Sequence, residues 1–229
     1  MPVHRRRAQR DRLSLPSISS SALLPFAGIN KIVSFITAIV FLHLAVDHGH
    51  AKSTTHLKDA TVLIIRHAEK PETGKDLAPA GVRRAEAYVA FFRSLTVNSH
   101  PVKIDHLFAA HQSKNSDRCR ETLLPLSNAL AKKLHTEFDV TEGQHLADKV
   151  KSSYSGESVL ICWHHGAIPD LLKAFGVDPK VLLPGGKWPE DVFGWLIVLR
   201  YDQNGQVTTS LSNEGIAPDD SRHPLPRGI

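Results

Sequence analysis

The sequence predicts one α/β domain in which helices cover both faces of a mostly parallel sheet. Short apolar runs, typical of strands buried on both faces, alternate with stretches that carry apolar residues at helical spacing. The alternation ends in two adjacent strand-like runs around a turn, which indicates a hairpin. Together these patterns predict a three-layer α/β/α sandwich.

The expected elements follow one another along the chain. The first strand is the largely apolar run over residues 60–65, and an apolar stripe at helical spacing predicts a helix over 81–95. Pro125 should bend the second helix or mark a fresh helix start. The remaining expectations are strands over 104–110 and 158–163, helices near 119–130 and over 166–175, and a hairpin of 192–201 with 206–211.

Composition and charge bound the class of protein. The chain has 229 residues, 41% hydrophobic and 22% charged, which suits one ordinary globular domain plus an extension. The net charge of +5 lies mainly at the N-terminus, because residues 1–51 hold six of the 28 Lys and Arg and two of the 23 acids. The rest therefore holds 22 basic against 21 acidic residues, and we expect no nucleic-acid groove in the folded domain.

The N-terminal segment has the order of an export signal. A basic stretch and Lys31 precede an apolar run of about 15 residues, and Gly49 and Ala51 offer a small-x-small cleavage site. Residues 1–51 are thus predicted to be a signal peptide, cleaved after Ala51, or an N-terminal membrane anchor, although the run is shorter than a typical span. Either case places the domain outside the cytoplasm, periplasmic or secreted. That domain is expected over residues 56–216, with a flexible tail over 217–229.

Arginine and histidine residues follow three of the expected strands. Arg66 and His67 follow the first strand, Arg118 lies in the segment after the second, and His164 and His165 follow the third. Ligands of such sheets bind beyond the carboxyl ends of the strands. Guanidinium groups match phosphate oxygens, and a neutral imidazole can attack phosphorus. The sequence therefore predicts phosphate chemistry that requires no metal or other cofactor.

Four segments follow one another in a characteristic order along the chain. They are 62–70 (VLIIRHAEK), 77–85 (LAPAGVRRA), 116–122 (SDRCRET) and 159–166 (VLICWHHG). With these segments the chain resembles the histidine phosphatase superfamily, also called the phosphoglycerate mutase-like or RHG family, over roughly residues 60–176. Ala68 replaces the commoner Gly of that family, and Ala78 replaces the commoner Thr.

The resemblance implies a role for the first histidine and for two arginines. It implies that His67 is the nucleophile that becomes phosphorylated and that Arg66 and Arg118 grip the phosphoryl oxygens. Arg118 is selected rather than Arg120 because the family's second arginine stands four residues before a threonine. The implied fold is phosphoglycerate mutase-like.

Two adjacent residues compete for the role of the second histidine, which binds the transferring group and stabilises its charge. In the common His-Gly pattern this histidine directly precedes glycine, which selects His165. A longer pattern, His-x-x-x-Ile-Pro, selects His164 instead. We prefer His165 from the sequence and keep His164 as the alternative.

The general acid has two candidates. Mutase-like relatives take a glutamate from an insertion after the second arginine, and the matching region here contains Glu142. Glu69 is the alternative, since it lies two residues from His67. The competing structural roles are a solvated loop carboxylate for Glu142 and a salt bridge to Lys70 or Arg83 for Glu69.

These patterns predict an exported phosphatase that hydrolyses a phosphomonoester, or phosphohistidine on a protein, with a small phosphorylated substrate as its partner. The alternatives are a phosphoglycerate mutase-like phosphotransferase and a non-catalytic protein of the same fold that binds a phosphate ligand. Cys119 and Cys162 are either two core thiols or a pair. The sequence specifies neither the substrate nor the oligomeric state.

Overall fold

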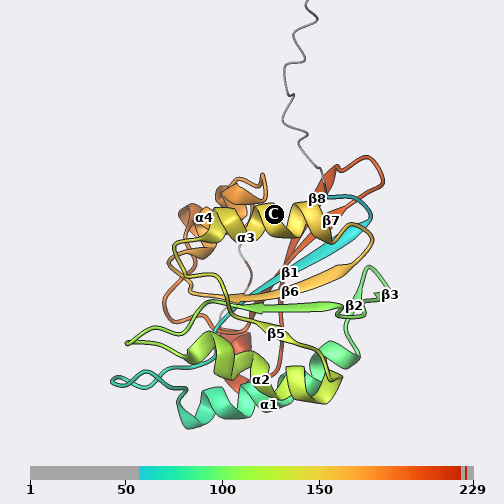
Figure 1. Ribbon diagram of the computed structural model, residues 1–229. Coiled ribbons are helices and arrows are strands. Elements are labelled where there is room, and N and C mark those ends of the chain that lie inside the picture. The colour runs from blue at the N-terminus through green and yellow to red at the C-terminus, as the bar shows by residue number, and fades with distance from the viewer. Residues whose placement is uncertain (1–56, 223–224, 226–229) are drawn as a thin grey trace, which may run out of the picture. The chain divides into compact units, whose positions relative to one another are not determined.

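A six-stranded sheet runs through the part of the chain that this computed structural model describes, residues 57–222 and 225 (Figure 1). The strand order is β5-β4-β6-β1-β7-β8, in which the first four strands are parallel and the last two form an antiparallel hairpin. The strands are β1 (Ala60–Arg66), β4 (His106–Ala109), β5 (Leu134–His135), β6 (Ser158–Trp163), β7 (Trp195–Tyr201) and β8 (Val207–Asn213), with a separate small ribbon of β2 (Thr96–Val97) and β3 (His100–Pro101).

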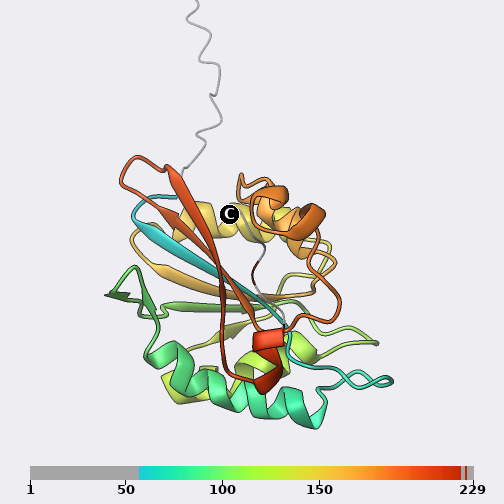
Figure 2. The ribbon, with the colours of Figure 1, turned by 180° about the vertical axis from the view of Figure 1, so that it is seen from behind.

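Helices cover both faces of this sheet. One face carries α1 (Pro79–Arg93) and α2 (Arg118–Leu130), and the other carries α3 (Gly143–Ser153) and α4 (Ile168–Ala174), as Figures 1 and 2 show from opposite sides. This arrangement confirms the three-layer α/β/α sandwich. Short 3-10 helices follow α4 and end the described chain: η1 (Pro179–Val181), η2 (Pro184–Gly186) and η3 (Pro218–Arg222).

The core lies between the layers and explains the apolar runs. Strands β1 and β6 are almost completely buried because helices cover them on both sides and other strands flank them. Cys119 and Cys162 are both free and buried in this core, as core thiols would be. Pro125 lies inside α2, which continues as one helix, since buried residues on both sides of the proline hold the helix against the sheet.

Two local expectations need correction. Helix α3 was not expected, because its start is polar and its apolar stripe is short; only Leu146, Ala147 and Val150 form it. Within the tail expected from residue 217, residues 218–222 form η3, in which Asp220 is buried.

The predicted export segment, residues 1–51, lies outside the described residues. Among the helices of residues 57–222, none has the length and apolar character needed to cross a membrane.

Candidate active site

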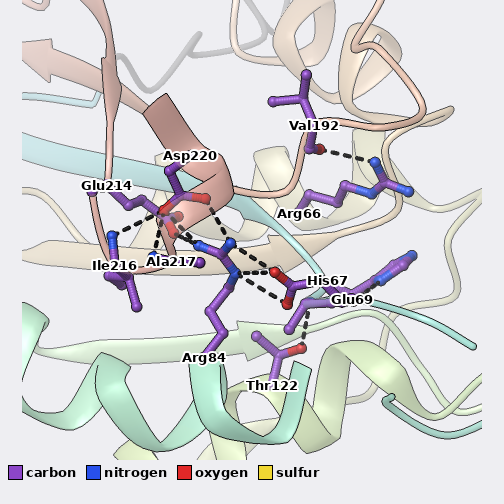
Figure 3. Close-up of polar contacts among 12 residues, drawn as sticks. Arg66, His67, Glu69, Arg84, Thr122, Val192, Glu214, Ile216, Ala217 and Asp220 are labelled. Carbon is purple, nitrogen blue, oxygen red and sulfur yellow. Dashed lines mark hydrogen bonds and ion pairs between the residues drawn. The ribbon is translucent and has the colours of Figure 1, made fainter. Parts of the chain in front are cut away.

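The segments 62–70, 116–122 and 159–166 meet at the carboxyl ends of β1 and β6. His67 N–H donates to the carbonyl of Trp163 at 3.1 Å, which extends the pairing of β1 with β6 by one residue. Ala68 N–H donates to the Thr122 hydroxyl at 2.9 Å, and this hydroxyl donates to the carbonyl of Arg118 at 2.7 Å. The first turn of α2 is thereby fastened to the loop that carries His67, near the lower centre of Figure 3.

Arg66 is buried with part of its guanidinium unused. One terminal nitrogen, Nη1, donates to the carbonyls of Pro189 at 3.3 Å, Glu190 at 2.6 Å and Val192 at 2.9 Å, the last of which Figure 3 shows. The Phe193 ring lies 3.9 Å from the guanidinium carbon. Nε and Nη2 have no hydrogen-bond partner in the described part of the chain, although the side chain is 0% exposed.

The unpaired donors of Arg66 can bind acceptor oxygens of a ligand. Burial lowers its pKa to about 10, an effect that the charges of Glu190 and Asp191 oppose, so the group stays cationic at neutral pH. Buried donors are nearly always satisfied, and a guanidinium with two free nitrogens suits a phosphate ligand.

His67 is held as a neutral imidazole. Burial lowers its pKa to about 3, and the neighbouring charges of Arg66, His164 and Arg118 act in the same direction. Its Nδ1 lies 2.8 Å from the carbonyl oxygen of Ala68. Because a carbonyl can only accept, Nδ1 carries the proton and Nε2 carries the free lone pair. The ring thus has the ionisation state and tautomer of a nucleophile.

The two adjacent histidines differ in what they face. The His164 ring packs edge-on against the His67 ring with centroids 5.2 Å apart. Burial lowers the pKa of His164, but the Cys119 thiol outweighs it, and the pKa is raised. The structure therefore places His164, the alternative, against His67.

His165, the residue preferred from the sequence, lies beside a neighbouring cavity. It lines a cavity of about 640 Å³ together with Trp188 and Glu190, and its Nδ1 is buried without a partner among the described residues. Burial, and then the charge of Arg66, lower its pKa to about 4. This histidine is thus placed to contact the remainder of a substrate.

Arg118 joins the site from the start of α2. Its guanidinium donates to the carbonyl of Asp76 at 3.2 Å and to that of Gly74, in the loop between β1 and α1. Its charge acts on both His67 and His164. Arg120 instead pairs with the buried Asp117. Arg118 is thus held between the start of α2 and the loop that follows β1.

Neither glutamate named from the sequence contacts His67 in the described part of the chain. Glu142 precedes α3, where its carboxylate accepts the Asp139 N–H at 2.8 Å and lies 3.5 Å from His145. Glu69 binds Arg84, with 2.7 Å between Oε1 and Nη2, rather than Lys70 or Arg83 (Figure 3).

Contacts made by three further residues shape this site. Phe193 and Glu190 lie more than 120 residues from Arg66 along the chain, and no local pattern announces their contacts with it. Arg84 had a signal, because it stands within the family-like segment over residues 77–85.

Comparison with known proteins finds similarity among solved structures alone: no protein-family model matches the chain, and no curated protein matches it. A protein assigned as phosphohistidine phosphatase SixA from Agrobacterium tumefaciens is 18% identical, with a TM-score of 0.46 over 68% of this chain and 97% of that one. Phosphoserine phosphatase from Entamoeba histolytica is 12% identical, with a TM-score of 0.46 over 69% and 98%. Phosphoglycerate mutase from Plasmodium falciparum is 17% identical, with a TM-score of 0.43 over 74% and 96%.

Proposed function

We propose that the chain is an exported phosphatase that hydrolyses a phosphomonoester, or phosphohistidine on a protein, through a phosphohistidine on His67. The observation that carries the proposal is the pairing of a buried, neutral His67 with Arg66, a buried cation that keeps two unpaired donors. This pair suits an anionic ligand with several acceptor oxygens, bound by Arg66 next to the nucleophilic nitrogen of His67.

In the first step, His67 Nε2 attacks phosphorus, the N–P bond forms and the bond to the leaving oxygen breaks. Arg66, through Nε and Nη2, and Arg118 hold the phosphoryl oxygens while their charge is redistributed. His164 is the second histidine in this proposal, because its ring faces His67. In the second step, water attacks the phosphohistidine and releases phosphate, which returns His67 to its neutral form.

A proton donor is needed when the leaving oxygen belongs to an alkyl alcohol. Glu142 and Glu69 remain the sequence-based predictions, but both carboxylates have other partners. We assign the role to Glu190, which lines the cavity beside His165 and whose own carbonyl binds Arg66. Its carboxyl group would protonate the leaving oxygen and then accept a proton from the attacking water.

The adjacent cavity supports an organic leaving group. A space of about 640 Å³ lies within the range of small-molecule sites, and Pro169, Pro179 and Trp188 give it apolar walls. A substrate that places its phosphate against Arg66 would extend past His165 into this space.

The activity is tested by p-nitrophenyl phosphate hydrolysis with residues 52–229 in excess EDTA, beside His67→Ala. The proposal expects turnover that survives EDTA and is lost in the variant. Turnover retained by His67→Ala would contradict the role of His67, and folded protein without turnover across acid to mildly alkaline pH would favour the binding-protein alternative.

The proton donor is tested by the dependence of rate on the leaving group. Glu190→Gln should slow hydrolysis of an alkyl phosphate such as phosphoserine far more than that of p-nitrophenyl phosphate, whose leaving group needs no proton. Glu142→Gln and Glu69→Gln are the matched variants. The assignment is wrong if one of them, rather than Glu190→Gln, shows the selective loss.

Export is tested with the full chain in a host cell by fractionation and N-terminal mass analysis. We expect the protein outside the cytoplasm, either beginning at residue 52 or retained on the membrane by residues 1–51. Intact chain in the cytoplasm would overturn this part of the proposal.

A further inference from the structure

The segment after β8 returns to the sheet and buries a carboxylate. Asp220, in η3, is 4% exposed and accepts the backbone N–H groups of Ile216 at 2.9 Å and Ala217 at 3.0 Å. It also binds Arg84 of α1 through both of its oxygens, at 2.6 and 3.0 Å (Figure 3). Such a bidentate pair fixes orientation as well as distance.

Arg84 joins this segment to the loop that carries the nucleophile. Its Nε and Nη2 donate to Glu69, two residues after His67, and its Nη1 donates to Glu214 at 3.0 Å. The side chain is 2% exposed, and every guanidinium nitrogen is bonded. Tyr88 donates to Glu214 and completes the cluster.

The other side of Asp220 touches the backbone that leads to Arg66. A Cβ on Gly194 would lie 2.2 Å from a carboxylate oxygen of Asp220, so this backbone rests directly on the carboxylate. Gly194 also accepts the Glu214 N–H at 2.8 Å. The two residues before Gly194 are Phe193, which stacks on the Arg66 guanidinium, and Val192, whose carbonyl binds it.

A closed path of contacts therefore runs from Arg66 through Phe193 and Gly194 to Asp220, and from there through Arg84 and Glu69 back to the chain next to His67. Among the described residues, no hydrogen bond or ion pair joins Arg84 or Asp220 to Arg66 or His67. The path sets where the unpaired nitrogens of Arg66 lie relative to the nucleophile, and phosphoryl transfer is sensitive to displacements of about 1 Å.

We propose that Arg84 and Asp220 are positioning residues for phosphoryl transfer, which hold Arg66 through Gly194 and Phe193 and hold the His67 loop through Glu69. The inference rests on the proposed function at the same site. The segment after β8 would then affect the reaction without contacting the substrate.

Two variants disturb the path in different ways. Asp220→Asn removes the charge and keeps the shape, whereas Gly194→Ala keeps every charge and pushes the backbone off the carboxylate. Asp105→Asn is the matched control: its carboxylate also accepts a backbone N–H, from Ser158 at 3.1 Å, and pairs with lysines, but at the opposite ends of the strands.

The measurements are kcat and KM with p-nitrophenyl phosphate, inhibition by inorganic phosphate, and melting temperature, with kinetics taken well below melting. We expect Asp220→Asn and Gly194→Ala to lower kcat about tenfold or more and to weaken phosphate inhibition, and Asp105→Asn to keep both within about twofold. Melting temperatures are expected to fall in all three.

The proposal is overturned if the two path variants fold and keep kcat and phosphate inhibition like the control. If the wild-type protein shows no turnover, the wild type and the variants are compared instead by their affinity for phosphate, measured by titration calorimetry. Equal phosphate affinity in wild type and variants, or none in any of them, would also overturn it, so failure of the proposed activity is distinguished from failure of the positioning role.

Discussion

Two buried arginines near the site differ in how they are satisfied. Arg84 bonds through all three guanidinium nitrogens to Glu69, Glu214 and Asp220, and these partners raise its pKa although burial acts in the opposite direction. Arg66 is equally buried, but two of its nitrogens have no partner among the described residues, and burial lowers its pKa to about 10. Figure 3 shows Arg84 with its three carboxylate partners, and Arg66 with its contact to Val192.

These patterns of bonding indicate that Arg84 stabilises and positions the surrounding structure, whereas Arg66 keeps donors for a ligand. A buried cation surrounded by carboxylates is compensated within the protein, so its removal leaves buried anions. A buried cation with unused donors is incompletely compensated, and it becomes fully bonded only when an anion binds. Burial alone would have assigned both residues the same role.

The largest expected effect is a loss of activity when Arg66 is replaced. Arg66→Met should lower kcat/KM by about 1,000-fold, because it removes the donors that face the phosphoryl group. Its free energy of unfolding should change much less than that of Arg84→Met. The substitution removes the donor to three backbone carbonyls, but this cost is offset because a buried, partly unpaired charge is removed as well. Steady-state kinetics and urea unfolding of both variants check this, and a smaller kinetic loss for Arg66→Met than for Arg84→Met would break the comparison.

On the side of stability, Arg84→Met should lower the free energy of unfolding by about 3–5 kcal/mol, because Asp220 and Glu214 would be left buried without their cation. Chemical denaturation measures it, with Arg120→Met as the control for a partly exposed pair. A loss below about 1 kcal/mol, which is typical of a surface pair, would show that the cluster is not a structural centre.

A smaller effect concerns pH. Because burial lowers the pKa of His67 to about 3, the unfolded chain binds a proton that the folded chain does not between about pH 6.5 and 3. Stability is therefore lost as pH falls through that range. His67→Asn should remove this contribution, so that the wild type loses on the order of 2 kcal/mol more than the variant between pH 7 and about pH 4.5. Parallel pH dependences of unfolding in the two proteins would contradict a buried neutral His67.

The smallest expected effect involves the thiol beside the second histidine. The Cys119 thiol outweighs burial and raises the pKa of His164, so Cys119→Ala should move that pKa down. The alkaline limb of the kcat profile should then shift to lower pH, with little change at its maximum. Cys162→Ala removes the thiol that interacts with Cys119, and it should shift this limb less. An equal shift in both variants would show that Cys119 has no specific effect on His164.

The sequence predicts the parts of this protein that depend on local pattern. The buried strands before Arg66 and His164 define the sheet, and the register of the segment 116–122 selects Arg118 rather than Arg120, which pairs with Asp117 in the structure. Parallel strand ends meet at one edge, so the meeting of these residues follows from topology.

What the sequence could not predict depends on contacts across long separations. The stacking of Phe193 on Arg66 and the bonds from Arg84 to Asp220 join residues more than 120 positions apart, and no periodicity encodes them. The short helix over residues 218–222 has no sequence signal for the same reason, because a polar, proline-rich segment gives no sign of the buried arginine that binds Asp220. His164 and His165 are adjacent, so only the direction of each ring distinguishes them.

His67 is proposed to be the nucleophile that becomes phosphorylated. Rapid quenching into alkali during p-nitrophenyl phosphate turnover, followed by intact-mass and peptide analysis, tests it directly. We predict an adduct of about 80 Da that maps to His67, is stable in alkali, is lost in acid and is absent from His67→Ala. An adduct on another residue, or turnover with none under conditions that trap phosphohistidine, would contradict the account.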